Sequence, residues 1–226
     1  MSISTMPGRR DEGGHGHLAY NLAGIAVLVL LTAVGLAYAI DQAGRTSRTP
    51  APALSDANPI IRTVAGQDLS IPANWFRFGE DMKPGFASQV DLQFMLDVVP
   101  GEKPVAVDVA LLPRSGARSS GTLLDTVYLH QFADETRGGF PGLVGKPLLA
   151  NEGYAGETVW YDPLSPAPFV AKCATAPDPA RADRCLRTIH LPSGLAVVLG
   201  FDAGALAGWR RFDDELAQWL GQIGAL

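Results

Sequence analysis

Residues 90–98 read VDLQFMLDV, and this stretch decides the fold class. Apolar side chains occupy every second position from Val90 to Val98, with mainly polar side chains between them, which is the pattern of a β-strand with one buried face. Pro100-Gly101 ends the strand, and residues 105–111 repeat the alternation with Asp108 on the polar side. We therefore predict a β-hairpin that turns around residues 100–103.

A second hairpin is predicted further along the chain. Residues 184–191 and 195–201 are strand-like runs on either side of Pro192-Ser193-Gly194. Because glycine takes a positive φ without steric cost, this tripeptide suits a tight turn. The two runs are therefore expected to pair as neighbouring strands.

Three further segments have strand character. Residues 157–162 and 169–173 are short candidates, and the prolines of residues 163–168 exclude regular structure between them. Residues 123–132 fit either a strand or a short helix. We favour the strand because β-branched and aromatic side chains are frequent there.

The last segment of the sequence predicts an amphipathic helix with Gly224 as its C-terminal cap. Its apolar side chains recur at three- and four-residue steps: Leu206, Trp209, Phe212, Leu216, Trp219, Leu220 and Ile223. The opposite face offers two ion pairs with i,i+4 spacing, Arg210–Asp214 and Arg211–Glu215. We predict an α+β domain, in which this helix covers one face of an antiparallel sheet that is curved or sandwiched. An all-β barrel with an appended helix is the alternative.

Residues 18–40, LAYNLAGIAVLVLLTAVGLAYAI, form an uncharged apolar run near the N-terminus. Its 23 residues would span a hydrocarbon core of about 30 Å as a helix with some tilt. We predict a retained signal-anchor helix after a cytoplasmic tail at residues 1–17. A signal peptide cleaved after Ala39 is the alternative, but the 17-residue leader is long and its two arginines are balanced by two acids.

The two cysteines, Cys173 and Cys185, bracket a polar loop rich in Pro, Ala and Asp. Neither belongs to a CxxC motif, so a disulfide in an oxidising compartment is favoured over a metal site. Two unrelated buried thiols are the alternative. Because arginines flank residues 18–40 on both sides, the positive-inside rule does not decide the orientation, and the disulfide argument places the later residues outside the cytoplasm.

Residues 41–58 are rich in Thr, Ser, Pro and Ala and have no structural period, which predicts a flexible tether. Residues 59–226 are then one extracytoplasmic domain. The abundance of Ala, Gly, Arg and Leu, with only four lysines, fits a bacterium with G+C-rich coding, so we expect an inner-membrane, single-pass protein with a periplasmic domain.

The charge distribution argues against nucleic acid as a partner. The chain has 18 basic and 23 acidic residues, a net charge of −5, and the two signs are interspersed. There is no basic stripe of the kind that follows a phosphate backbone. The predicted partners are the lipid bilayer, through residues 18–40, and an envelope protein. Gly35 and Ala39, four residues apart, would also suit a homodimer contact between membrane helices.

The histidines offer weak candidates for chemistry. His15 and His17 lie in a Gly-rich leader without further metal ligands, and we predict neither a metal nor a cofactor. His130 and His190 would need a carboxylate and a serine nearby to form a hydrolase triad, and the chain has no G-x-S-x-G motif. No residue is therefore assigned a catalytic role.

Two segments are candidate partner-binding loops. Residues 137–146 are Gly-rich but lack the Ser or Thr after Lys146 that a P-loop requires, so a long surface loop is expected. With the residues that follow, this segment offers Phe140 and Tyr154. Trp160 and Tyr161 precede the proline-rich loop, and such aromatic residues often anchor interfaces.

We therefore expect a non-catalytic, membrane-anchored domain that acts through protein contacts in the cell envelope. A membrane-anchored periplasmic hydrolase with a histidine-centred site is the alternative.

Overall fold

The computed structural model describes residues 51–226. The predicted membrane helix at residues 18–40 and most of the predicted tether lie outside this range. Within residues 51–226, no helix has the length and apolar character required to cross a bilayer.

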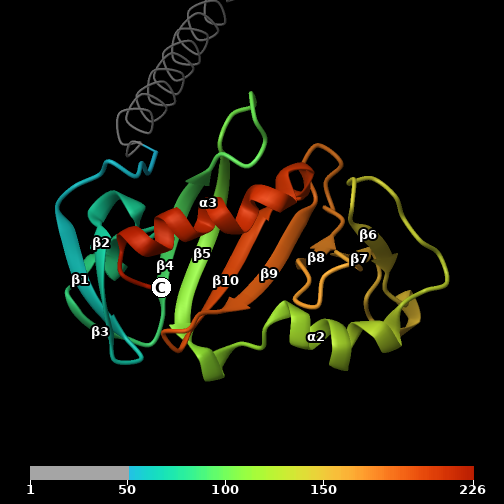
Figure 1. Ribbon diagram of the computed structural model, residues 1–226, viewed down its shortest axis with the longest axis horizontal. Coiled ribbons are helices and arrows are strands. Elements are labelled where there is room, and N and C mark those ends of the chain that lie inside the picture. The colour runs from blue at the N-terminus through green and yellow to red at the C-terminus, as the bar shows by residue number, and fades with distance from the viewer. Residues whose placement is uncertain (1–50) are drawn as a thin grey trace, which may run out of the picture. The chain divides into compact units, whose positions relative to one another are not determined.

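A seven-stranded antiparallel sheet forms the centre of the domain (Figure 1). In spatial order its strands are β4 (Val90–Leu96), β5 (Val105–Pro113), β10 (Leu195–Asp202), β9 (Arg184–His190), β8 (Val170–Ala174), β7 (Glu157–Tyr161) and β6 (Val144–Pro147). Both predicted hairpins are confirmed, because β4 pairs with β5 and β9 pairs with β10. Gly194 has a φ of 88° in the second turn. The short strands expected on either side of residues 163–168 are β7 and β8, and they pair with each other.

A second, three-stranded sheet was not anticipated from the sequence. It consists of β1 (Pro59–Val64), β2 (Gln67–Pro72) and β3 (Gly85–Ala87), in the order β2-β1-β3. The hairpin between β1 and β2 turns at Ala65 and Gly66, whose φ angles are 51° and 84°. Two consecutive positive φ angles define a type I′ turn, for which Asn-Gly is the usual sequence and Ala-Gly is not. This explains why the turn gave no sequence signal.

The C-terminal helix α3 (Trp209–Gln222) lies across one face of the seven-stranded sheet (Figure 1). Trp219 from this helix lies against Phe94 of β4 and against Trp75, with ring centroids 5.0 and 4.7 Å away. Gly224 caps the helix as predicted: its φ is 76°, and the following amide of Ala225 donates to the Leu220 carbonyl at 2.9 Å. An α+β domain with an antiparallel sheet and a C-terminal helix packed on it is therefore confirmed.

Two details of the helix prediction need correction. Leu206 is buried but belongs to a 3₁₀ helix, η6 (Ala203–Gly208), that precedes α3. Of the two predicted ion pairs, Arg211–Glu215 is present at 3.1 Å. Arg210 instead donates to the carbonyl of Pro141.

The prediction of a strand at residues 123–132 is wrong. The segment forms helix α2 (Ser120–Thr126) followed by the 3₁₀ helix η4 (Tyr128–Gln131). Ser119 is the N-cap residue, and its Oγ accepts a hydrogen bond from the amide of Thr122 at 3.2 Å. Leu124 and Tyr128, four residues apart, both pack into a small cluster with residues of β7 and β8. The cap and this spacing outweigh the β propensity on which the prediction rested.

The remaining connections contain short 3₁₀ helices. These are η1 (Ala73–Trp75), η2 (Gly79–Met82), η3 (Arg114–Gly116) and η5 (Ala150–Glu152). Residues 137–146 were expected to form one surface loop, but their last part belongs to β6.

Residues 51–58, the end of the predicted tether, contact the domain. Trp75 Nε1 donates to the carbonyl of Ala53 at 3.2 Å and to Asp56 Oδ2 at 3.1 Å. Gln222 Nε2 donates to the carbonyl of Leu54 at 2.5 Å. A hydrogen bond from the Ala53 amide, with further ones from Asn74 and Trp75, lowers the pKa of Asp56.

Candidate functional site

Both ring nitrogens of His190 are engaged. His190 lies on β9 in the lining of a cleft of about 530 Å³. Arg114 Nε donates to its Nδ1 at 3.0 Å, and its Nε2 donates to the carbonyl of Ala117 at 2.7 Å. His190 therefore holds the segment between β5 and α2 in place.

The other members of a possible triad make different contacts. Ser120 and Asp125 line the same cleft, but Ser120 Oγ accepts from the amide of Thr188 at 2.9 Å. His130 is exposed in η4 and does not line this cleft. The structure thus brings His190, a serine and an aspartate into one cleft without the hydrogen bonds that would link them. Within residues 51–226, no three His, Cys, Asp or Glu side chains converge to hold a metal ion.

Two of the predicted partner-binding aromatics pack against each other, Trp160 buried and Phe140 partly buried. Trp160 lies in β7 with 9% of its surface exposed, and Phe140 meets it edge to face with centroids 4.8 Å apart. A Cβ atom at Gly145 would lie 2.7 Å from the Trp160 ring, so glycine is needed there for the ring to fit. The Trp160 ring is therefore enclosed by packed side chains.

The loop that carries Phe140 is also fixed. Trp209 Nε1 and Arg210 Nη1, both from α3, donate to the carbonyl of Pro141 at 3.0 Å. The two tyrosines from the same prediction, Tyr154 and Tyr161, are half-buried against the small cluster under α2, where Tyr161 stacks on Phe132. The aromatics selected from the sequence thus mainly fill space between elements.

A different surface is uncovered. The side chains of the central strands that point away from α3 form what we call the open face of the sheet. These residues are Asp91, Gln93 and Met95 of β4, Ala106, Asp108 and Ala110 of β5, Val198, Gly200 and Asp202 of β10, and Arg184 and Leu186 of β9. On this side, α2 contacts β8 and β9, where the amide of Thr188 donates to Ser120 Oγ, whereas α3 packs on the other face.

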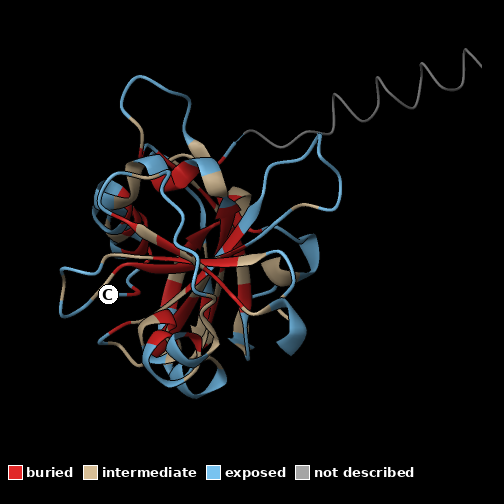
Figure 2. Cartoon of the chain, turned by 90° about the vertical axis from the view of Figure 1, so that its right-hand side faces the viewer, coloured by how far each residue is buried: buried red, intermediate tan, exposed pale blue. Residues whose placement is uncertain are grey.

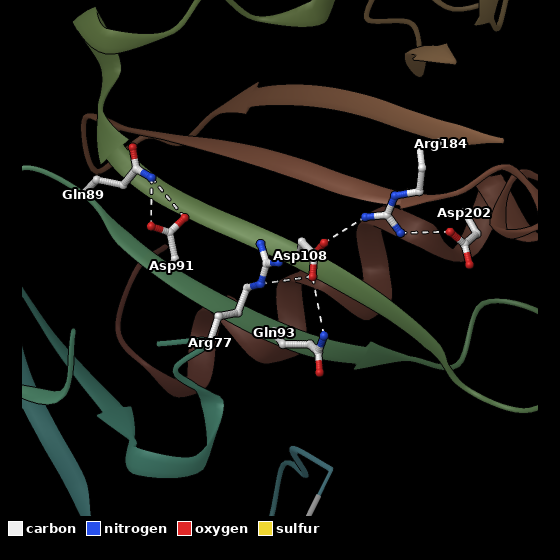
Figure 3. A network of polar contacts seen from close by, with 7 residues as sticks. All are labelled: Arg77, Gln89, Asp91, Gln93, Asp108, Arg184 and Asp202. Carbon is white, nitrogen blue, oxygen red and sulfur yellow. Dashed lines mark hydrogen bonds and ion pairs between the residues drawn. The ribbon is translucent and has the colours of Figure 1, made fainter. Parts of the chain in front are cut away.

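Asp108 is the centre of a polar network on the open face (Figure 3). Arg184 Nη2 donates to its Oδ2 at 2.8 Å, and Arg77 Nε lies 3.3 Å from its Oδ1. Gln93 Nε2 completes the set at 3.4 Å. The side chain of Asp108 is 25% exposed, so its charge is held at the surface by fixed donors.

Arg184 reaches Asp108 across an intervening strand. Arg184 belongs to β9 and Asp108 to β5, with β10 between them, and the β10 residue in register with Asp108 is Gly200. A Cβ atom at Gly200 would be in ordinary van der Waals contact with Arg184 Nη2, at 3.5 Å, so the guanidinium lies directly beside this residue. The hydrogen bond from Arg184 Nη1 to Asp202, together with Asp108, raises the pKa of Arg184 above its ordinary value.

The missing side chain at Gly200 leaves a hollow of about 210 Å³ in the open face. Its lining includes charged groups of the network and apolar groups from β5, β9 and β10. Leu186 has 53% of its surface exposed, and Phe78, beneath the guanidinium of Arg77, has 46%. The open face therefore combines fixed charges with exposed apolar surface.

The disulfide lies next to this face. Cys173 and Cys185 form a register pair between β8 and β9 and are bonded as predicted. Their loop is fixed at its base, since Asp183 accepts from the amide of Ala176 at 2.9 Å and its carbonyl accepts from Ala203 at 2.8 Å. A second hollow, of about 490 Å³, lies against this loop and shares Arg184 and Asp202 with the network: its lining is Ala176, Pro177, Arg181, Ala182, Arg184 and Asp202.

Sequence reasoning found only part of this site. It placed Asp108 on the outer face and paired the cysteines, but it assigned no role to Arg77, Arg184 or Gly200. The alternation of β4, β5 and β9 identifies outward positions. Which outward residues meet depends on the order of the strands. Arg184 and Asp108 are 76 residues apart in the sequence and meet because β5 and β9 lie on either side of β10.

Comparison with known proteins gave one informative fold likeness. No protein-family model and no curated protein matches the chain. A solved structure of an immunity protein of the Stenotrophomonas maltophilia type IV secretion system is similar, with a TM-score of 0.50 and 11% sequence identity. The match covers 78% of this chain and 99% of that one. At this identity the likeness shows a shared fold.

Proposed function

We propose that this protein is anchored in the inner membrane by residues 18–40 and binds a protein partner outside the cytoplasm through the open face of its sheet. The observation that carries the proposal is the contrast between the two faces of the central strands. One face packs on α3, and the other presents a polar network beside exposed apolar side chains.

The composition of the open face suits a protein interface. Interfaces combine buried apolar contacts with hydrogen bonds, and arginine is enriched among the residues that contribute most to affinity. Leu186 and Phe78 supply exposed apolar surface, while Arg77 and Arg184 are held in place by Asp108. Because these charges are already ordered, binding loses little side-chain entropy.

The proposed location rests on the sequence and on the disulfide. Residues 18–40 have the length and composition of a membrane helix. A disulfide between Cys173 and Cys185 is typical of proteins that fold outside the cytoplasm. A solved protein of similar fold is an immunity protein of a type IV secretion system, which adds proteins of such a system to the candidate partners.

The test is recovery of partners with the full chain from its own membranes, comparing two matched variants. Leu186→Asp places a charge on the open face. Leu164→Asp makes the same change at a leucine that is 89% exposed in the loop between β7 and β8. We expect Leu186→Asp to lose a partner that the unmodified chain and Leu164→Asp both retain.

Equal recovery of every partner by the two variants would overturn the role of the open face. Two copies of the chain with different tags are produced together as a test of self-association. Their recovery as a complex would identify a second copy of this chain as the partner, in place of an envelope protein. Location is tested separately by adding protease to spheroplasts: digestion of the domain supports the outer orientation, and protection in intact spheroplasts contradicts it.

A further inference from the structure

One carboxylate that lines the hollow over Gly200 has no ion-pair partner among residues 51–226. Arg184 is shared between Asp108 and Asp202, and Arg77 pairs with Asp108. The hollow itself is lined by these two cations and by two carboxylates, Asp108 and Asp91, and both cations pair with Asp108. Within residues 51–226, no Lys or Arg side chain lies within ion-pair distance of Asp91.

The contact between Asp91 and Gln89 resembles the contact that an arginine side chain would make with this carboxylate. Gln89 Nε2 lies 3.0 Å from Oδ1 and 2.9 Å from Oδ2, so a single amide nitrogen sits between both carboxylate oxygens (Figure 3). An arginine guanidinium binds a carboxylate from this same direction with two parallel N–H donors. Gln89 is exposed and can swing away without disturbing packed side chains.

The remaining walls of the hollow suit the stem of a long basic side chain. Ala110, Leu186 and Val198 line it on the apolar side. Long basic side chains place their methylene groups along such surface and keep the charged end on polar groups. The volume of about 210 Å³ leaves room for one side chain and excludes a folded segment.

We propose that this hollow receives an arginine side chain of the protein partner, with Asp91 accepting the hydrogen bonds of its guanidinium. The inference rests on the proposed function, since it names the chemistry by which the open face recognises its partner. It assigns Asp91 to recognition, and Asp108 to holding Arg77 and Arg184 in place.

The test uses a small probe and needs no identified partner. The full chain in detergent micelles, with labelled methyl groups, is titrated with N-acetyl-arginine amide and, separately, with N-acetyl-glutamine amide, while methyl NMR signals are recorded. We expect saturable shifts at Ala110, Leu186 and Val198 with the arginine probe and none with the neutral probe.

Two substitutions in the hollow are expected to change the affinity for the arginine probe in opposite directions. Asp91→Asn should weaken binding of the arginine probe about tenfold, because a charge-assisted pair of hydrogen bonds is lost. Arg77→Gln should strengthen it, because a competing cation leaves the hollow. Asp214→Asn removes a carboxylate that is exposed on α3, on the covered side of the sheet, and should leave affinity unchanged.

Three results would overturn the inference: no saturable shift at these methyl groups, equal shifts with the glutamine probe, or full binding by Asp91→Asn. The outcome is independent of partner recovery. A failed titration with a partner still lost by Leu186→Asp refutes only the arginine contact, whereas partners retained by Leu186→Asp refute the proposed function itself.

Discussion

The two faces of the central sheet come from the same strands and differ in almost every physical respect. On the face under α3, Phe94, Leu199 and Phe201 have no exposed surface. On the open face, the neighbouring positions hold Asp108 and Leu186, which keep a quarter and a half of their surface exposed. One face therefore supplies the buried apolar packing of the domain, while the other keeps charged and apolar side chains exposed to solvent. Figure 2 shows the buried residues gathered along the strands at the centre of the domain.

The largest effect is expected from a cavity in the covered face. Trp219→Ala removes a ring that contacts both Phe94 and Trp75, and should lower the free energy of unfolding by about 3–5 kcal/mol. Denaturant unfolding of the full chain in detergent, followed by fluorescence of the remaining tryptophans, measures the loss. Gln218→Ala, on the exposed side of the same helix, is the control and should change little. A loss equal to that of the control would contradict the assignment of stability to this face.

The disulfide should have the next largest effect, because its sulfurs lie in the covered core while its loop borders the open face. The two cysteines are 12 residues apart, for which loop closure predicts a stabilisation of about 3 kcal/mol. We expect Cys173→Ala with Cys185→Ala to lower the free energy of unfolding by that amount. A reducing agent should destabilise the unmodified chain similarly and leave the double variant unaffected. Destabilisation of the double variant by the reductant would point to another cause.

A smaller effect is expected from the polar network of the open face. The Arg184–Asp108 pair is partly exposed, so a double-mutant cycle with Arg184→Gln and Asp108→Asn should give a coupling of about 1 kcal/mol or less. The coupling should shrink further in high salt because water and ions screen exposed charges. Unfolding of the four proteins at two salt concentrations checks both points. A coupling as large as the cost of Trp219→Ala would remove the distinction between the faces.

The smallest effect concerns the contact of residues 51–58 with the edge of the covered face. The pKa of Asp56 in the folded protein lies below its ordinary value of 3.8, so the unfolded state binds more protons in this range. Its contribution to stability is therefore present above pH 3.8 and is lost as the pH falls through the folded-state pKa. We expect Asp56→Asn to lower the denaturant midpoint at pH 6 and to match the unmodified chain at strongly acidic pH. A difference that does not depend on pH would refute this assignment.

Much of the fold follows from local patterns. The alternation in residues 90–98 and 105–111 and the turn at Gly194 each predict a hairpin that the structure contains. Residues 123–132 were misassigned because β propensity was weighed there without the Ser119 cap. The β1–β2 hairpin was missed because Ala65 takes a left-handed conformation that alanine seldom adopts.

The candidate site was less predictable for a physical reason. Aromatic residues such as Trp160 and Phe140 attract attention in a sequence, yet the same apolar area that suits an interface also suits a core. The structure packs the two rings edge to face, with Trp160 buried and Phe140 partly buried. Charged residues are common at the outward positions of strands, so nothing in the sequence distinguished Arg77 and Arg184 from other surface residues.

The sequence by itself determined the covered face. Apolar residues that recur at every second position of a strand, or every three to four positions of a helix, must bury one side of that element. It also determined that two cysteines bracket a polar loop. Only the tertiary structure decided that Gly200 lies between Arg184 and Asp108, and that Asp91 is left without a cation among residues 51–226. The reason is that strand alternation is a local property of the chain, whereas the neighbours of an outward side chain depend on the order in which distant strands pair.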